Sequence, residues 1–302
     1  MLPSILKKVR LLDLKTKNKI TSLFAGNYRS AFKGRGIEFA DIRPYDMGDD
    51  VRDIDWKTSS KQNQLFVKTY HEARDNNVFF LIDVSSAMRF QSTEKSKYET
   101  LLETFAMLAL SAVQNGDRVG AMVYGNGKPK IFPAKKRRKN ILNIMAYCLE
   151  QYMQKNPHRG AGHSAKKSMP KEEVFHLLNK YLKRSAVVFW LTSDLELDQK
   201  SREKIKLLKH KHDFIPLVIN DPVENNWCKT GHFVLQDSVT GELQNFFADR
   251  QVLEKFRKLR LVKQKNFAGF FRQNHLDTLF IETTDKLFTK LLKFFQFRQM
   301  KV

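Results

Sequence analysis

Two aspartates and a serine, each just after an apolar run, are the residues whose types and spacing most favour chemistry. The run "VFFLIDV" over 78–84 contains Asp83 near its end, and Ser85 follows two residues later. A second run, "AVVFWLT" over 186–192, is followed by Asp194. Ligands of open α/β sheets bind beyond the carboxyl ends of the strands, where the strand order reverses. Because Mg²⁺ prefers oxygen ligands, these side chains predict a cation site at such an edge.

Strands and helices alternate from residue 78 onward, and this alternation must position the candidate side chains. Apolar runs predict strands at 78–84, 118–125, 129–134, 186–192, 213–219 and 278–282, and helical periodicity covers 94–114, 138–153, 171–183, 198–210, 249–273 and 285–298. The alternation predicts an α/β fold, a Rossmann-like doubly wound, mainly parallel sheet with helices on both faces. The segment "HFVLQDSVTGELQNFF" predicts a hairpin inserted near 231–247.

The first 77 residues differ in pattern from the rest. Residues 1–20 predict a short basic amphipathic helix, and "GIEFADIR", "DIDWKTS" and "LFVKTYHEA" predict short strands between turns. We therefore expect an N-terminal β-rich region over 1–77, packed as an elaboration on an α/β domain over 78–302.

Composition narrows the class of protein. The 302 residues include 54 Lys and Arg against 32 Asp and Glu, a net charge of +22, but 42% of them are hydrophobic, which excludes a disordered polycation. No run reaches the roughly 18 apolar residues of a membrane span. The first residues do not follow the pattern of a secretory leader, so we expect a cytoplasmic protein. The two cysteines, Cys148 and Cys228, lie 80 positions apart and predict neither a disulfide nor a zinc site.

Three segments resemble a von Willebrand factor A-type domain: "DVSSAM", "GDRVGAMVYG" and "WLTSD". The block "GNYRSAFKGRGIEFADIRPYDMGDDVRDIDWKTSS" resembles the signature of the bacterial family called domain of unknown function 58, in which such a block precedes an A-type domain. "NDPVENNW" and "DSVTGE" resemble the C-terminal part of that family. The likeness covers nearly the whole chain from about Gly26.

The resemblance implies a metal-ion-dependent adhesion site (MIDAS) that this chain matches unevenly. Asp83 and Ser85 match the first two positions of its Asp-x-Ser-x-Ser loop, Ala87 stands where the second serine belongs, and Asp194 matches the distal carboxylate. Ser164 is the nearest counterpart of the distal threonine. Two interpretations stay open: a weakened Mg²⁺ site in which water replaces the lost hydroxyl, and a vestigial site.

The segment "GDDVRDIDW" gathers acidic residues around one arginine. Clustered carboxylates can hold two metal ions, so one hypothesis is a metal-dependent nuclease. The favoured alternative is a structural turn in which the arginine pairs with an acid and the tryptophan docks on the core, and the family resemblance supports it. The signature residues are Gly48, Asp49, Asp50, Arg52, Asp55 and Trp56.

A basic run is the densest part of the positive charge: Lys135, Lys136, Arg137, Arg138 and Lys139. Basic residues recur in "KLLKHKH" and in the amphipathic "RQVLEKFRKLRLVKQK". Such charge could neutralise nucleic-acid phosphates, meet an anionic membrane, or simply be solvated. No nucleic-acid motif accompanies it, so contact with lipid or an acidic partner is favoured over sequence-specific nucleic-acid binding.

Motifs of common enzymes are missing from the sequence. It contains no G-x-x-x-x-G-K-[ST], G-x-S-x-G or H-E-x-x-H. We therefore expect a non-enzymatic protein-interaction module whose degenerate MIDAS-like crevice meets an acidic group of a partner. The family resemblance implies a MoxR-type AAA+ ATPase as partner, in chaperone-like assembly or activation of client proteins, often at the cell envelope. We expect a cytoplasmic protein, with a peripheral position at the inner face of the membrane as a further expectation. The alternative is a nucleic-acid-binding protein or nuclease that uses the basic surface and the acids between Asp49 and Asp55.

Overall fold

A six-stranded, mostly parallel sheet forms the centre of the protein, here a computed structural model that describes residues 37–62, 64–72, 76–154, 169–227, 229–236 and 242–300. The strand order is β10-β7-β6-β3-β4-β5, and β5 alone runs antiparallel to its neighbour. The strands are β3 (Asn77–Asp83), β4 (Arg118–Tyr124), β5 (Lys130–Lys135), β6 (Val187–Thr192), β7 (Asp213–Asn220) and β10 (Leu279–Glu282). The expected mixed α/β fold with a mainly parallel sheet is confirmed.

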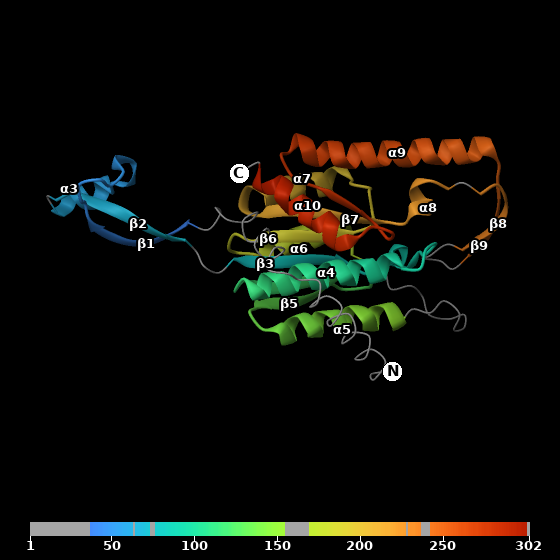
Figure 1. The fold of residues 1–302 in the computed structure, drawn as a ribbon, viewed down its shortest axis with the longest axis horizontal. Helices are drawn as coiled ribbons and strands as arrows, with labels where there is room; N and C mark the ends of the chain where they lie inside the picture. Colours follow the sequence, from blue (N-terminus) through green and yellow to red (C-terminus); the bar gives the residue numbers. More distant parts are fainter. Residues whose placement is uncertain are drawn as a thin grey trace.

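Helices cover both faces of this sheet (Figure 1). One apolar core joins the sheet to α4 (Lys97–Gln114), α5 (Arg138–Gln154) and α10 (Leu287–Gln299). The core on the other face joins it to α6 (Lys171–Tyr181), α7 (Gln199–Lys211) and α9 (Arg250–Gln273). Each predicted helix of residues 78–302 is therefore present, with ends shifted by no more than three residues.

The central strands form where the sequence is apolar without interruption. All residues of β6 and β7 are buried, as are those of β3 after Asn77, which is the pattern of strands covered on both faces. In the register between β3 and β6, Phe80 lies beside Phe189, and the two rings stack with centroids 5.4 Å apart. This pairing fixes the two strand ends that carry the candidate aspartates.

A separate hairpin unit precedes the sheet and is described by itself. It consists of β1 (Ile37–Pro44), paired antiparallel with β2 (Phe66–Glu72), and of the short helices η1 (Val51–Asp53) and α3 (Trp56–Gln62) between them. The prediction of a strand over "DIDWKTS" is wrong, because most of that segment is helical. Asp55 accepts hydrogen bonds from the Lys57 amide and the Thr58 hydroxyl at the start of α3, so it caps a helix. The predicted helix over 1–20 lies outside the described residues.

The predicted hairpin between the last strands of the sheet is confirmed. Strands β8 (Gly231–Gln236) and β9 (Leu243–Ala248) pair antiparallel between the short helix α8 (Pro222–Asn225) and α9. Figure 1 shows this hairpin at the N-terminal end of α9. Among the described helices, none is both long and apolar enough to cross a bilayer.

Candidate functional site

Asp83 and Asp194 meet where the strand order reverses. Asp83 ends β3 and Asp194 lies two residues beyond β6, which pairs with β3 in parallel. The chain continues from β3 to β4 on one side, whereas β6 and β7 lie on the other, so this edge is the switch point at which open α/β sheets bind ligands. The charge of Asp194 helps to raise the pKa of Asp83, so the two carboxylates lie close enough to interact, as the sequence predicted.

The carboxylate of Asp83 is buried and fully engaged. Oδ1 accepts a hydrogen bond of 2.8 Å from the backbone amide of Ser85, and Oδ2 accepts one of 3.1 Å from the hydroxyl of Thr192. Burial raises the pKa of Asp83, and the hydrogen bonds from Ser85 oppose that rise. The side chain therefore ties the β3–η2 loop to the end of β6, since η2 (Ser86–Arg89) begins directly after Ser85.

Gly125 lets the loop after β4 approach this carboxylate. Its φ of +103° is left-handed, and a Cβ at this position would lie 2.7 Å from the Ser85 amide nitrogen and 2.8 Å from Oδ1 of Asp83. Only glycine combines that backbone conformation with such close approach. The "GNG" segment over 125–127 therefore forms one wall of the site.

Asp194 makes an ion pair that the sequence did not suggest. Its Oδ2 lies 2.5 Å from Nζ of Lys171, the first residue of α6, and its Oδ1 accepts a 2.8 Å hydrogen bond from the Glu196 amide. The same ammonium group donates to the backbone carbonyl of Glu196. The Asp194 and Lys171 side chains are 39% and 26% exposed, so the pair is accessible to a partner.

These donors do not fit a divalent cation. Octahedral Mg²⁺ needs six oxygen ligands, yet each oxygen of both carboxylates already accepts a hydrogen bond or faces an ammonium group. Ala87 contributes no oxygen, and Ser164 lies outside the described residues. The positive charge beside Asp194 comes from Lys171, and no cluster of three or more His, Cys, Asp or Glu suited to a metal occurs within the described ranges.

A groove of about 530 Å³ adjoins this ion pair. Its walls come from the start of α6, the β6–α7 loop and α9, and both signs of charge line it. Lys263 pairs with Glu196 across it at 2.5 Å, while the guanidinium of Arg202 lies 5.4 Å from the ring of Phe270. The groove is thus an open surface with both polar and apolar lining that continues from Lys171.

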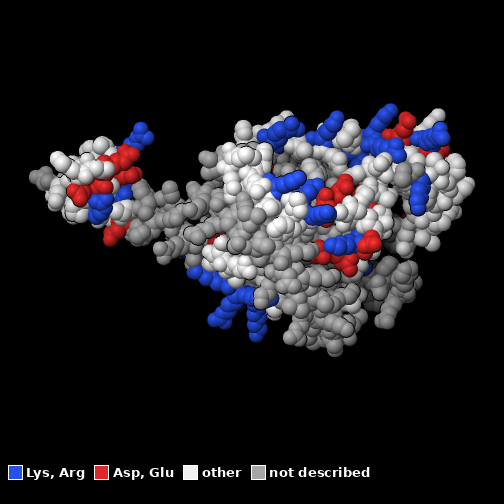
Figure 2. All heavy atoms as spheres, in the orientation of Figure 1, with Lys and Arg blue, Asp and Glu red and all other residues white. Residues whose placement is uncertain are grey.

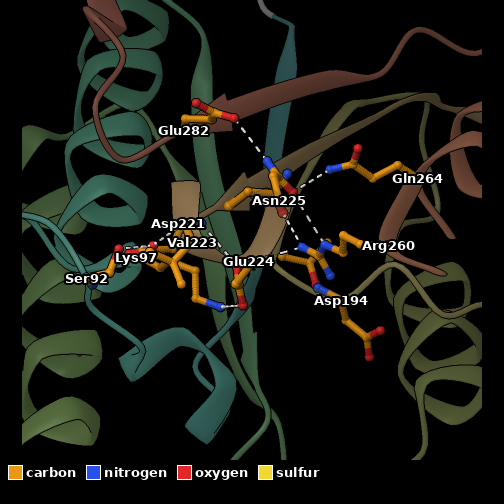
Figure 3. A network of polar contacts seen from close by, with 12 residues as sticks. Ser92, Lys97, Asp194, Asp221, Val223, Glu224, Asn225, Arg260, Gln264 and Glu282 are labelled. Carbon is orange, nitrogen blue, oxygen red and sulfur yellow. Dashed lines mark hydrogen bonds and ion pairs between the residues drawn. The ribbon is translucent and has the colours of Figure 1, made fainter. Parts of the chain in front are cut away.

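A second polar network lies at the ends of β7 and β10 (Figure 3). Glu224 of α8 pairs with Lys97 at 2.6 Å, and the Lys97 side chain is only 1% exposed. Asp221 caps α8 and accepts hydrogen bonds from the amide and hydroxyl of Ser92. The "NDPVEN" segment therefore joins the start of α4 to the end of β7.

Arg260 connects this network to α9. Its guanidinium donates a 2.8 Å hydrogen bond to Oδ1 of Asn220 and lies 3.7 Å from Oε2 of Glu224. Burial lowers the pKa of Arg260, and the charges of Glu224 and Asp194 oppose that fall. Figure 3 shows Arg260 reaching toward Glu224 with Asp194 beside it. Asn225 lies between Gln264 of α9 and Glu282 of β10, with hydrogen bonds of 2.7 and 3.0 Å.

The acids of the N-terminal signature serve local structure. Asp49 pairs with Arg43 at 2.6 Å, and this contact lowers the pKa of Asp49. Asp50 accepts from the backbone amide of Arg52 and so caps η1. The expected pairing of the Arg52 side chain with an acid is not found within the described residues.

The other three signature residues lie at a turn, on the surface and at the start of a helix. Gly48 has a φ of +116°, which explains a glycine at this turn. Trp56 is 64% exposed, so the expectation that it docks on the core is wrong. Asp55 caps α3 and lies 3.8 Å from Lys68. The carboxylates of Asp49, Asp50 and Asp55 thus each make a separate local contact.

The basic run and the cysteine that the structure describes lie outside the candidate site. The basic run Lys135–Lys139 spans the end of β5 and the start of α5, and its side chains are exposed. Cys148 is a buried free thiol whose pKa burial raises to about 12, and Cys228 lies outside the described residues.

A family model described as "Protein of unknown function DUF58" matches residues 41–266. The chain belongs to this family. That match covers the whole candidate site: both aspartates, Lys171, the "NDPVEN" segment and Arg260. The matched region includes most of the hairpin unit and five of the six strands of the sheet, all except β10.

Bacterial relatives share this family's sequence at low identity. "Uncharacterized protein Rv1480" of Mycobacterium tuberculosis is 20% identical over 270 residues, which cover 89% of this chain and 82% of that protein. "Uncharacterized protein YeaD" of Bacillus subtilis is 30% identical over 108 residues, 36% of this chain and 25% of that protein.

Solved structures resemble the DUF58 chain weakly. The "conserved hypothetical protein BatB" of Bacteroides thetaiotaomicron aligns with a TM-score of 0.41 and 11% identity, over 75% of this chain and 100% of that one. An "aerotolerance-related membrane protein" of Bacteroides fragilis aligns with the same TM-score, identity and coverage.

Sequence reasoning missed Thr192, Lys171 and Arg260. Thr192 was within reach, because it is the last residue of the apolar run that precedes Asp194. The Asp221-Pro-x-Glu224 spacing is that of a capping box and could have drawn attention to Glu224. Lys171 and Arg260 carry no local signal, since they reach the site only through the packing of α6 and α9.

Proposed function

We propose that this DUF58 chain is a non-enzymatic protein-interaction module. Its docking site is the exposed Asp194–Lys171 pair together with the adjoining groove. The observation that carries the proposal is the position of this pair at the switch point of the sheet, where α/β folds present ligand sites. The buried Asp83 holds the site's shape, and Lys171 offers a fixed positive charge to a carboxylate of the partner.

The partner in this proposal is a MoxR-type AAA+ ATPase, and the pair acts in chaperone-like assembly or activation of client proteins. Family membership supports this partner class, and so does the von Willebrand factor A-like character that the "DVSSAM" and "WLTSD" segments imply. In such domains a partner's acidic group binds at the loop edge. Here the ammonium of Lys171 takes the part of the cation, so docking needs no metal.

Affinity capture from the native host tests the proposal. The tagged full chain, with and without ATP, is expected to recover an AAA+ ATPase. Lys171→Glu is expected to lower that recovery at least tenfold, because it places a carboxylate where the partner's acid binds. Lys139→Glu makes the same charge change at an exposed position of α5 and serves as the matched control.

Two results would count against the proposal. Failure to recover an AAA+ ATPase in either nucleotide state removes the partner class. Equal recovery by Lys171→Glu and wild type, with both proteins folded, removes the docking site.

A further inference from the structure

The helix α9 carries an outward face that its packing leaves open. Buried Leu253, Phe267 and Phe271 define its inner side. On the opposite side, residues three and four apart align along one stripe. That stripe consists of Lys255, Lys258, Leu259, Val262 and Lys265, and all five are exposed. We call it the α9 outer face.

Apolar and cationic side chains are interleaved on this face. Leu259 and Val262 are 55% and 52% exposed, and the three lysines flank them. Two other cations of α9 already form ion pairs: Arg260 with Glu224 and Lys263 with Glu196. Figure 2 shows Lys and Arg gathered along α9. The outer lysines make no ion pair with the part of the chain that the structure describes.

The β8–β9 hairpin extends the α9 outer face at the N-terminal end of that helix. One side of the hairpin is held in place by aromatic contacts: Trp227 lies 5.0 Å from Phe233 and 6.0 Å from Phe256 of α9. The other side presents Val234 and Leu243, which are 65% and 68% exposed. A firmly anchored hairpin therefore displays apolar side chains next to a cationic helix.

The shape of this surface selects among partners. The stripe stands on the convex outside of a helix, whereas the groove beside Lys171 is lined by Lys263, Asn266 and Phe267 of α9. A partner helix requires a groove to receive it. A lipid surface accepts apolar side chains that project from a convex face, while lysines along the face attract anionic headgroups.

We propose that the α9 outer face docks this protein on an anionic membrane surface. Leu259 and Val262 enter the headgroup boundary, and Lys255, Lys258 and Lys265 bind lipid phosphates. The sheet edge with Asp194 and Lys171 does not take part, so this contact is independent of the protein-docking site proposed above.

Vesicle flotation with the full chain tests this proposal. The protein is expected to float with vesicles of phosphatidylcholine plus phosphatidylglycerol, but not with phosphatidylcholine alone. The triple variant K255Q/K258Q/K265Q is expected to lower the partition coefficient by about 100-fold, because each lysine near an anionic surface raises that coefficient by about fivefold. The double variant L259Q/V262Q is expected to lower it by about tenfold through lost apolar burial.

The matched control removes equal charge from the opposite layer of helices. K135Q/R137Q/K139Q changes exposed residues at β5 and α5, and it should keep the wild-type partition. Equal loss in both triples would show a diffuse charge effect and overturn the proposal. Binding that survives the α9 triple would also overturn it, as would binding to polyglutamate without binding to anionic vesicles, which would indicate an acidic protein instead. Thermal unfolding of each variant verifies that it is folded.

Discussion

The hydroxyl of Thr192 donates a hydrogen bond of 3.1 Å to Oδ2 of Asp83 and thereby joins the ends of two neighbouring parallel strands. The same oxygen of Thr192 accepts the Asp194 amide at 3.1 Å. One buried hydroxyl thus sets both the loop after β3 and the loop after β6. The hydrogen bond to the Asp83 carboxyl group and the one from the Asp194 amide together hold the two loops at the switch point.

Thr192→Val is expected to destabilise the protein by about 1–3 kcal/mol, because it keeps the shape of the side chain but leaves a buried carboxylate oxygen without its donor. Urea unfolding followed by circular dichroism measures the change. Thr192→Ser retains the hydroxyl and should recover most of the loss. A Val variant as stable as wild type would show that Asp83 is satisfied in another way.

Gly125→Ala is expected to cost more stability than Gly116→Ala, although both glycines have positive φ. Gly116 has open space around it, so an added Cβ there costs only the left-handed conformation, about 1 kcal/mol. At Gly125 the Cβ would also overlap the Ser85 amide and Asp83, adding about 2 kcal/mol. Paired denaturation curves measure the difference, and equal costs would contradict the close approach.

The sequence predicted the order of the elements and the meeting of Asp83 with Asp194. Continuous apolar runs reveal buried strands, and a parallel sheet brings their carboxyl ends to one edge. The pattern failed at "DIDWKTS", because the capping role of Asp55 in a seven-residue helix outweighs a weak strand signal.

The cationic partners of Asp194 and Glu224 depend on packing that no local pattern encodes. Lys171 lies 23 positions before Asp194, and Arg260 lies 36 positions after Glu224. Both arrive at the site because α6 and α9 cover the same face of the sheet. Exposure of Trp56 was unforeseen for a similar reason, since an aromatic side chain alone does not show which surface it faces.

Because Lys171 pairs with Asp194, divalent cations are expected not to stabilise the protein through this site. The melting temperature of the wild type should stay unchanged when millimolar Mg²⁺ or Mn²⁺ is added, because an ammonium group already neutralises Asp194. Thermal-shift assays of Lys171→Met then ask whether removing that charge creates metal-dependent stabilisation. Stabilisation of wild type by metal, lost in Asp83→Ala, would contradict the role assigned to Lys171 and restore a metal site.

Lys97→Met is expected to destabilise the protein by about 3 kcal/mol, because it leaves Glu224 in a partly buried network with the more distant Arg260 as its remaining cation among the described residues. Lys200→Met is the matched control: Lys200 lies 3.6 Å from Glu172, and the two side chains are 72% and 27% exposed. Exposed pairs contribute less than about 1 kcal/mol. Similar losses in the two variants by urea unfolding would show that burial does not distinguish these pairs.

His212 is expected to make folding sensitive to mild acid. The ring is 2% exposed, neither ring nitrogen has a partner within the described residues, and burial, with a smaller effect from Lys211, lowers the pKa of His212 from 6.5 to about 4. The unfolded chain therefore binds more protons than the folded chain between these values. Stability from this residue is complete above about pH 6.5 and falls as the pH drops toward 4, by about 3 kcal/mol.

His212→Leu separates this effect from the protonation of carboxylates, which also weakens the protein in acid. The leucine fills much of the same buried space but binds no proton, so the free energy of unfolding should fall less steeply than in wild type between pH 7 and about pH 4. The α7 residue His210 is exposed, so His210→Leu should keep the wild-type slope. Parallel slopes for His212→Leu and wild type would mean that His212 is protonated in the folded protein, with a partner that its buried position does not show.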